Sequence, residues 1–335
     1  MRDDRWRRED GDGGAGTRLG GLVMHDGFRL PLLSWEPVGT PLATIIALHA
    51  FGDFRRAFEE VGPELARRGY RVHAFDQRGF GDTLGHGQWH GWRRLVRDLR
   101  QAIERLRPAD GMPVYLLGES MGGGVALVAA ARFRPAGVAG VILVEPAVRR
   151  GVRWRLMWDV AVGTLALLAP GYSRRLQRGW QPELTERARA RLAGDPRIVR
   201  TIRADAYRGL LALADAASAA TRRVRLPVLL LYGRADGIIP LRLFEQATLD
   251  LAPRVTALRY PAAPHLLLQT ESWSEVLADI EAWIAGEPLP ASTEGVLLAP
   301  GPRPGEPVAL PLRRPLVPGM GLRRRARRGA APPAG

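Results

Sequence analysis

A serine in a glycine-bounded turn is the residue of this sequence best placed to act as a nucleophile. Ser120 lies in the stretch GESMG, in which Gly118 and Gly122 stand two residues before and two residues after it. The stretch joins a short apolar run to a helical pattern, and so tight a strand-to-helix turn leaves almost no room for side chains at those two positions. The turn would raise the Ser120 hydroxyl above a sheet and aim the Met121 N–H at an oxyanion. The spacing therefore predicts nucleophilic attack on a carbonyl group.

A nucleophilic serine needs a base and a carboxylate that orients the base, and the sequence offers both in order. His265 is the one histidine of six that follows Ser120, and it lies just after an expected strand at 255–260. Asp236 lies between them, just after an expected strand at 227–232. Because open parallel sheets form their sites at strand ends, the order Ser, Asp, His predicts a catalytic triad.

The loop after the first central strand is the expected source of a second oxyanion donor. This loop reads His49-Ala50-Phe51-Gly52. We expect the Phe51 N–H to act together with the Met121 N–H, and we expect His49 and Gly52 to support the loop. No metal or cofactor is expected, because His86 and His90 lie among glycines and cannot form a helical metal face.

Strand-length apolar runs alternate with helical patterns along most of the chain. A hairpin is expected around Asp26-Gly27. Further strands are expected at 43–48, 70–75, 114–117, 138–144, 227–232 and 255–260, and helices at 55–68, 92–106, 121–133 and 272–284. This alternation predicts an α/β fold with a mostly parallel, doubly wound sheet. The core is expected over 18–148 and 224–287, and the mainly helical stretch 149–223 breaks the alternation as an insertion.

Charge and composition restrict the class of protein. The 335 residues contain no cysteine, which excludes disulfides, thiolate nucleophiles and Cys-ligated metals. All the basic residues are arginines, and the net charge of +15 arises in two segments, because 149–223 holds 16 Arg against 6 acids and 288–335 holds 8 against 2. The proline-rich segment 288–335 and the polar segment 1–17 are expected to be disordered. The absence of a signal-peptide pattern predicts a cytoplasmic location.

Three stretches resemble the α/β-hydrolase superfamily: LHAFGDFRRAFEEVGPELARRGYRVHAFDQRGFGDT, YLLGESMGGGVAL and LPVLLLYGRADGIIP. They are most similar to the branch of monoacylglycerol lipases, lysophospholipases and serine aminopeptidase-like hydrolases. The family's oxyanion loop usually reads H-G-x-G, and Ala50 replaces its first glycine here. The resemblance implies an α/β-hydrolase fold in which 149–223 forms a helical cap after the strand that follows the nucleophile helix. Such a cap sets substrate choice.

The most apolar part of the expected cap, Leu156–Pro170, lies between arginine-rich segments that also contain tryptophan. Asp159, Gly163 and Pro170 argue against a membrane-spanning helix, and the pattern is typical of an interfacial anchor. The alternative is that this stretch covers an acyl pocket and the arginines are solvated. The arginine-rich tail adds attraction to anionic lipid. Nucleic acid is not an expected partner, because the tail has no interleaved aromatics.

These features predict a serine hydrolase that cleaves carboxylic esters, with a monoacylglycerol or a lysophospholipid-like molecule as the expected substrate. In this reaction Ser120 attacks, His265 transfers the proton and Asp236 fixes the imidazole. Peptidase, thioesterase and perhydrolase chemistry on the same scaffold are alternatives, since the fold does not fix the reaction. A further alternative is a non-catalytic, membrane-associated binder, which would not react with a serine-directed phosphonate.

Overall fold

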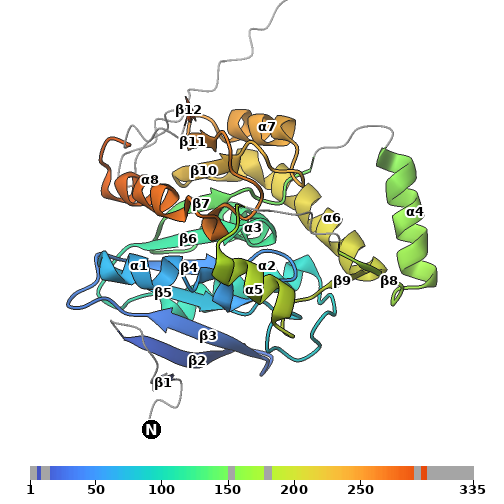
Figure 1. Cartoon of the computed structure of the whole chain (residues 1–335), viewed down its shortest axis with the longest axis horizontal. Coiled ribbons are helices and arrows are strands. Elements are labelled where there is room, and N and C mark those ends of the chain that lie inside the picture. Colours follow the sequence, from blue (N-terminus) through green and yellow to red (C-terminus); the bar gives the residue numbers. More distant parts are fainter. Residues whose placement is uncertain (1–5, 9–15, 150–154, 177–182, 290–295, 300–335) are drawn as a thin grey trace, which may run out of the picture.

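A ten-stranded mixed sheet runs through the molecule in the computed structural model, which describes residues 6–8, 16–149, 155–176, 183–289 and 296–299 (Figure 1). The strand order in the sheet is β1-β2-β3-β5-β4-β6-β7-β10-β11-β12. The strands are β1 (Trp6–Arg8), β2 (Thr17–Val23), β3 (Arg29–Trp35), β4 (Ala43–Leu48), β5 (Tyr70–Phe75), β6 (Val114–Glu119), β7 (Val138–Val144), β10 (Val228–Gly233), β11 (Val255–Tyr260) and β12 (Val296–Ala299). The central pairings from β5 to β11 are parallel, and the outer ones are antiparallel.

Helices cover both faces of this sheet, so its central strands β4, β6 and β10 are buried along their whole length. In β4 all six residues are buried, with Ile46 and Leu48 in the core on one face and Ile45 in the core on the other. One face packs against α1 (Val61–Arg67) and α8 (Trp273–Ala285). The other packs against α2 (Trp92–Leu106), α3 (Met121–Phe133), α6 (Ala204–Ala220) and α7 (Leu241–Leu251). The doubly wound α/β fold expected from the alternation is confirmed.

The stretch 149–223 leaves the sheet after β7 and returns at β10. Its described elements are α4 (Arg155–Leu168), β8 (Ser173–Arg175), α5 (Glu186–Gly194), β9 (Thr201–Arg203), α6 and the short 3-10 helix η2 (Thr221–Arg223). The strands β8 and β9 form a separate antiparallel pair. In Figure 1, α4 projects from the body beside the end of α6, whereas α5 lies over the strand ends.

The structure differs from the expected elements at several places. The helix expected at 55–68 is divided into the 3-10 helix η1 (Arg55–Phe58) and α1, because the ring of Pro63 is tolerated in a first helical turn but not further inside a helix. The helix α7 was not anticipated. A second 3-10 helix, η3 (Leu267–Gln269), follows the His265 loop.

Two segments expected to be disordered contribute edge strands, and this corrects the prediction. Trp6–Arg8 pairs with β2, and Val296–Ala299 pairs with β11. Pairing at a sheet edge uses backbone groups, so segments of three or four residues can supply such strands whether they are mainly basic, as WRR is, or apolar, as VLLA is. The other residues of the expected disordered ends, 1–5, 9–15, 290–295 and 300–335, lie outside the described residues.

Candidate active site

Ser120 stands at the sharp turn between β6 and α3 in a backbone conformation that few residues adopt. Its φ of 51° and ψ of −111° are unfavourable for a residue with a side chain. The surrounding backbone holds this conformation, because the Ser120 N–H donates to Val144 O at 2.9 Å and its carbonyl accepts from Ala147 N–H at 2.8 Å. The strained turn places the hydroxyl at the carboxyl ends of the parallel strands.

The two glycines around Ser120 are required by the space available to them. A Cβ atom on Gly122 would lie 2.2 Å from the carbonyl oxygen of Leu48 in β4. A Cβ atom on Gly118 would lie 2.6 Å from the backbone of Gly122. These contacts are shorter than any that packed atoms adopt, so a larger residue at either position would move the turn or the neighbouring strand.

His265 and Asp236 meet Ser120 at hydrogen-bond distance. Nε2 of His265 lies 3.0 Å from Oγ of Ser120, and Nδ1 lies 2.9 Å from Oδ2 of Asp236. The other Asp236 oxygen accepts the N–H groups of Ile238 and Ile239 at 2.6 and 2.9 Å. Because the carboxylate is fixed by its own loop, it can hold the imidazole with the Nδ1 proton toward itself and Nε2 toward the serine.

The acidic surroundings of His265 make it a stronger base. Burial favours the neutral imidazole, but the hydrogen bond with Asp236 and the charges of Glu145, Asp236 and Glu119 outweigh burial and raise the pKa of His265 to about 9. An imidazole with a raised pKa binds more strongly the proton that it takes from the serine hydroxyl. The arrangement can therefore abstract a proton from Ser120 and stabilise the imidazolium that results.

A second carboxylate, not anticipated from the sequence, also faces His265. Glu145 follows β7, is fully buried, and places Oε2 3.5 Å from Nδ1 of His265. A charged residue directly after the buried run Val138–Val144 was a signal that could have revealed it, because side chains at such strand ends face the site. Burial raises the pKa of Glu145 to about 8.

Glu145, Asp236 and His265 form the one cluster, among the residues that the structure describes, whose donor atoms lie within 4.8 Å of one another as in a metal site. A metal bound there would need a lone pair on Nδ1 of His265. In the arrangement seen, Nδ1 faces Asp236 while Nε2 faces Ser120, which requires the proton on Nδ1. Nδ1 therefore cannot bind a metal while it carries the proton that faces Asp236. The contact of Nε2 with Ser120 fits proton transfer.

The loop His49–Gly52 lies beside the serine, and His49 is held as a neutral support. Its Nδ1 lies 2.8 Å from Ala50 O and its Nε2 accepts the Gln77 N–H at 3.0 Å, so both ring nitrogens are engaged. Burial lowers the pKa of His49, which fits the neutral ring. Met121 is the first residue of α3, and the N–H groups of a first helical turn have no acceptor inside the helix.

A cavity of about 240 Å³ opens onto the candidate triad. Its lining is largely apolar and comes from three regions: the oxyanion loop, the triad loops and the stretch 149–223. The residues are Ala50, Phe51, Asp53, Ser120, Leu176, Ile202, Tyr207, Leu210, Ile238, His265 and Leu266. An apolar cavity with a nucleophile at its wall suits a substrate with a hydrocarbon part.

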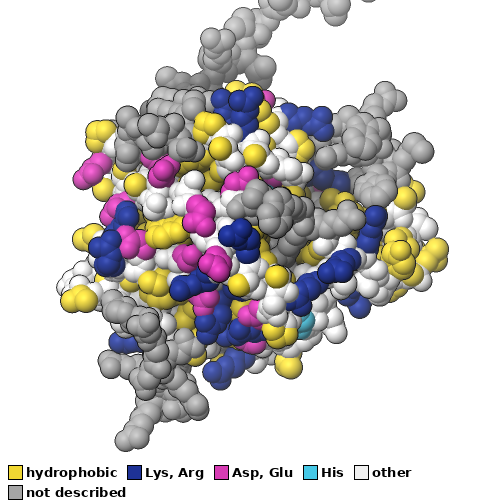
Figure 2. Space-filling model, viewed as in Figure 1, with side chains coloured by type: hydrophobic (Ala, Val, Ile, Leu, Met, Phe, Trp, Pro, Cys, Tyr) yellow, Lys and Arg dark blue, Asp and Glu magenta, His cyan; other side chains and the backbone are white. Residues whose placement is uncertain are grey.

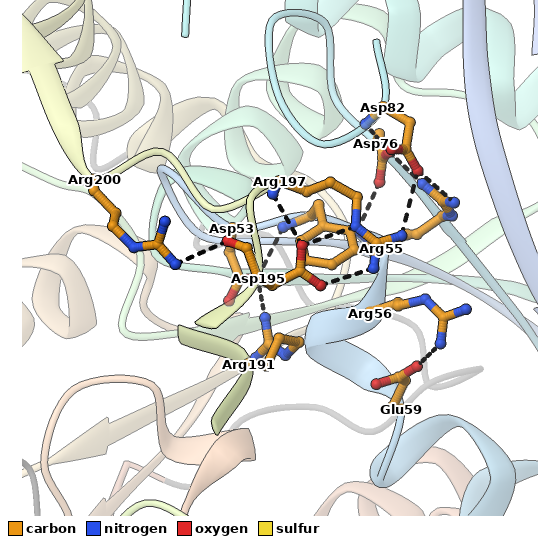
Figure 3. Close-up of polar contacts among 11 residues, drawn as sticks. Asp53, Arg55, Arg56, Glu59, Asp76, Asp82, Arg191, Asp195, Arg197 and Arg200 are labelled. Atoms are coloured by element: carbon orange, nitrogen blue, oxygen red, sulfur yellow. Dashed lines mark hydrogen bonds and ion pairs between the residues drawn. The ribbon is translucent and has the colours of Figure 1, made fainter. Parts of the chain in front are cut away.

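A buried ion pair fastens α5 over the site. Arg191 binds Asp53, and the two side chains are 7% and 1% exposed (Figure 3). Arg191 also donates to Gln269 Oε1 at 2.6 Å, and Gln269 in turn donates to Glu119 Oε2 at 2.7 Å. Glu119 immediately precedes Ser120, so this chain of polar contacts connects the insertion with the nucleophile turn.

A second set of contacts joins the same insertion to the oxyanion loop and to the core. The Val199 N–H donates to Gly52 O at 2.9 Å. Arg197 approaches Asp82 at 3.6 Å, and Arg55 of η1 holds the same carboxylate at 2.8 Å, as Figure 3 shows. The insertion is thus positioned by polar contacts on the loop that would bind the oxyanion.

Among the side chains that the structure describes, those of α4 take no part in this lining. Of its described side chains, 160–168, none lines the cavity, and Leu167 and Leu168 are 76% and 77% exposed. Figure 2 shows hydrophobic side chains gathered on this projecting part of the molecule, at the right of the view. Tyr172 beyond the helix is also exposed, and Arg174 and Arg175 follow it at the surface.

The sheet order, the serine turn and the Ser–His–Asp contacts together define the α/β-hydrolase class. The family model described as serine aminopeptidase, S33, matches residues 39–272. The chain belongs to this family.

The comparisons also find lipases among similar proteins. Over 135 residues the chain is 37% identical to human monoglyceride lipase, an alignment that covers 38% of this chain and 42% of the relative. The chain thus spans less than half the length of this relative. It is 26% identical over 282 residues to a monoacylglycerol lipase of Mycolicibacterium smegmatis, covering 77% of this chain and 93% of the relative.

Two solved structures support the fold. A soluble variant of monoglyceride lipase from Saccharomyces cerevisiae, in complex with a substrate analogue, superimposes with a TM-score of 0.68 at 19% identity, covering 83% of this chain and 98% of that one. The thioesterase domain from the curacin biosynthetic pathway superimposes with a TM-score of 0.60 at 20% identity, covering 78% and 97%. At such identities the likeness establishes the α/β-hydrolase fold.

Proposed function

We propose that this protein is a serine hydrolase that cleaves the carboxylic ester of a lipid-like monoester, such as a monoacylglycerol or a lysophospholipid. The observation that carries the proposal is the contact of Ser120 with His265 at 3.0 Å and of His265 with Asp236 at 2.9 Å, at the wall of an apolar cavity. The lipases found among its relatives support the choice of substrate.

The geometry supports a two-step reaction through an acyl-enzyme. His265 Nε2 takes the hydroxyl proton while Ser120 Oγ forms a bond with the ester carbonyl carbon, and the Phe51 and Met121 N–H groups hold the oxyanion. As the tetrahedral intermediate collapses, His265 gives the proton to the leaving alkoxide and glycerol or another alcohol departs. A water molecule then repeats the sequence, with His265 as its base, and releases the fatty acid. Asp236 keeps the imidazole in the required tautomer throughout.

The test is the release of fatty acid from a monoacylglycerol by the purified protein, with Ser120→Ala assayed in parallel. We expect hydrolysis by the wild type and a loss of at least about 10³-fold in the variant, because the nucleophile is removed. If the wild type releases no fatty acid, a panel of short esters, thioesters and peptides decides between the alternative reactions. Labelling of Ser120 by a serine-directed phosphonate separates all of these enzymes from a non-catalytic binder.

We also propose that α4 makes peripheral contact with a lipid surface. Among the described residues, no helix is both long and apolar enough to cross a membrane. The exposed apolar side chains of α4 and the arginines after it instead suit an interface between water and an anionic bilayer.

Sedimentation with vesicles of phosphatidylglycerol and phosphatidylcholine tests this contact. We expect the double variant Leu167→Glu, Leu168→Glu to bind several-fold more weakly than the wild type, because charge would have to enter the interface. The matched control is Val38→Glu, since Val38 is 90% exposed on a loop outside 149–223. Equal binding by the double variant and the wild type would refute the role of α4.

A further inference from the structure

Glu145 is a buried carboxylate that no step of the ester-hydrolase mechanism uses. It lies directly after β7 with a φ of 47°, a conformation that is unfavourable for a residue with a side chain. Its side chain is completely buried. A positive φ and a buried carboxylate each raise the free energy of the folded state. Residues with such features occur most often where a functional site requires a particular geometry.

The Glu145 carboxylate joins the loop that carries Asp236 to the loop that carries His265. Oε1 accepts the N–H of Gly233, three residues before Asp236, at 3.0 Å. Oε2 accepts the N–H of Leu266, the residue after His265, at 2.9 Å. Both oxygens are therefore fixed, and the distance of 3.5 Å from Oε2 to His265 Nδ1 follows from those bonds.

The charged groups that face His265 come from three strand ends. Asp236 follows β10 and hydrogen-bonds Nδ1, Glu145 follows β7 and lies beside the same nitrogen, and Glu119 at the end of β6 acts at longer range. Glu119 is itself bound to Gln269 at 2.7 Å, which turns its carboxylate toward η3. Glu145 is thus the nearest charge to the imidazole after Asp236.

We propose that Glu145 is a positioning residue of the triad, which fixes the His265 loop against the Asp236 loop and supplies a second negative charge to the imidazolium. The inference rests on the proposed function for its catalytic meaning. Glu145 does not replace Asp236, because its two oxygens are held by Gly233 and Leu266 and lie too far from Nδ1 for a hydrogen bond.

The electrostatics support a coupling between the two groups. Burial raises the pKa of Glu145 to about 8, and the positive charge of His265 opposes that rise. In the other direction, the charge of Glu145 contributes to raising the pKa of His265. Formation of the imidazolium during catalysis therefore favours the ionised carboxylate, which in turn stabilises the imidazolium.

The experiment follows the imidazole of His265 by NMR in protein labelled with ¹⁵N-histidine, with the His265→Ala spectrum used to assign the signal. It needs no substrate, so its failure is distinct from a failure of the proposed function. In the wild type we expect two titration steps for His265, because the ring senses its own protonation and that of Glu145. In Glu145→Gln we expect one step, at a pKa lower by about one unit, because a nearby negative charge is removed.

Two further variants complete the design. Glu145→Asp keeps the charge and is expected to retain two steps, whereas Asp279→Asn removes a buried carboxylate that binds Tyr260, away from the triad, and is expected to leave the His265 titration unchanged. If His265 of the wild type titrates in a single step, that result alone overturns the proposal. An unchanged His265 pKa in folded Glu145→Gln also overturns it, even if activity falls, because a purely structural role would not move this pKa.

Discussion

At the scale of the residue, two carboxylates approach the same nitrogen of His265. Asp236 lies at 2.9 Å and accepts a hydrogen bond, whereas Glu145 lies at 3.5 Å, too far for a hydrogen bond of good geometry. The difference of 0.6 Å supports the two proposed roles, in which Asp236 selects the tautomer of His265 and Glu145 adjusts its basicity. The roles follow from what else each carboxylate binds, because the two N–H groups on Asp236 leave Oδ2 available to the ring.

Asp236→Asn is expected to lower kcat by about 10³- to 10⁴-fold with little change in KM, because an amide can present a donor to Nδ1 and stabilise the wrong tautomer. The measurement is steady-state hydrolysis of the monoacylglycerol, with circular dichroism to verify folding. Asp110→Asn, on an exposed loop, is the control and should retain wild-type turnover. Near-wild-type kcat in Asp236→Asn would show that Asp236 is not the orienting acid.

At the scale of the element, the site depends on how closely β6 and α3 approach β4. The turn that carries Ser120 is pressed against the carbonyl oxygen of Leu48, so glycine is needed at the start of α3 although it is a poor helix former. The insertion is then placed over this turn by α5, whose Arg191 reaches Asp53 and Gln269.

Gly122→Ala is expected to destabilise the fold by about 1–3 kcal/mol and to reduce phosphonate labelling of Ser120, since the added methyl group displaces the turn or β4. Chemical denaturation and labelling rates measure the two effects. Gly163→Ala in α4 is the matched control. Nothing lies within 4 Å of a Cβ at that position, so alanine should be neutral or stabilising there. Equal stability of Gly122→Ala and the wild type would contradict the packing argument.

Arg191→Met is expected to lower the melting temperature by about 5–10 °C, because Asp53 is left as a buried charge without its ion-pair partner. The loosened α5 should also lower kcat/KM, since the oxyanion loop loses a support. Arg67→Met is the comparison, because Arg67 is 71% exposed and such surface pairs contribute about 0–1 kcal/mol. Melting temperatures of both variants equal to that of the wild type would contradict this role of Arg191.

At the scale of the whole molecule, the sheet divides two hydrophobic cores, and the buried ionisable groups of the site gather at its carboxyl edge. Burial there raises the pKa of Glu119 to about 7 and that of Glu145 to about 8. Their ordinary value is 4.5, so the folded protein retains protons that the unfolded chain has released. Such a site makes global stability depend on pH.

Stability is expected to fall as pH rises from about 7 to 9. The folded-state pKa values of Glu145 and His265, about 8 and about 9, exceed their ordinary values, so each group stabilises the fold fully at low pH and loses that contribution by the time pH has risen through its folded pKa. For Glu119, whose folded pKa is about 7, most of the loss is complete by pH 7. Burial lowers the pKa of His73 to about 3, so this residue makes stability rise with pH, but only below its ordinary pKa of 6.5. Urea unfolding at pH 7, 8 and 9 measures this. A rise in the free energy of unfolding over that range would contradict it.

The sequence by itself determined the central elements and the choice of Ser120, Asp236 and His265. Strands buried on both faces are continuous apolar runs, and the requirement for glycine at position 118 is local, because a Cβ there would meet the backbone of Gly122. Such short-range constraints can be read from neighbours along the chain. The edge strands at Trp6–Arg8 and Val296–Ala299 could not be predicted in this way, because three or four residues are too few to establish a pattern.

Only the tertiary structure shows what the Glu145 carboxylate binds, which residues line the cavity and how α4 is oriented. Glu145 and Leu266 are 121 residues apart in sequence, and nothing near either one reveals their hydrogen bond. The apolar run in α4 has two interpretations, as a pocket cover or as an anchor, and the exposure of its described side chains Leu167 and Leu168 supports our proposal of the second. Periodicity shows that a helix is apolar, but what it packs against depends on the approach of distant segments, which only the folded chain specifies.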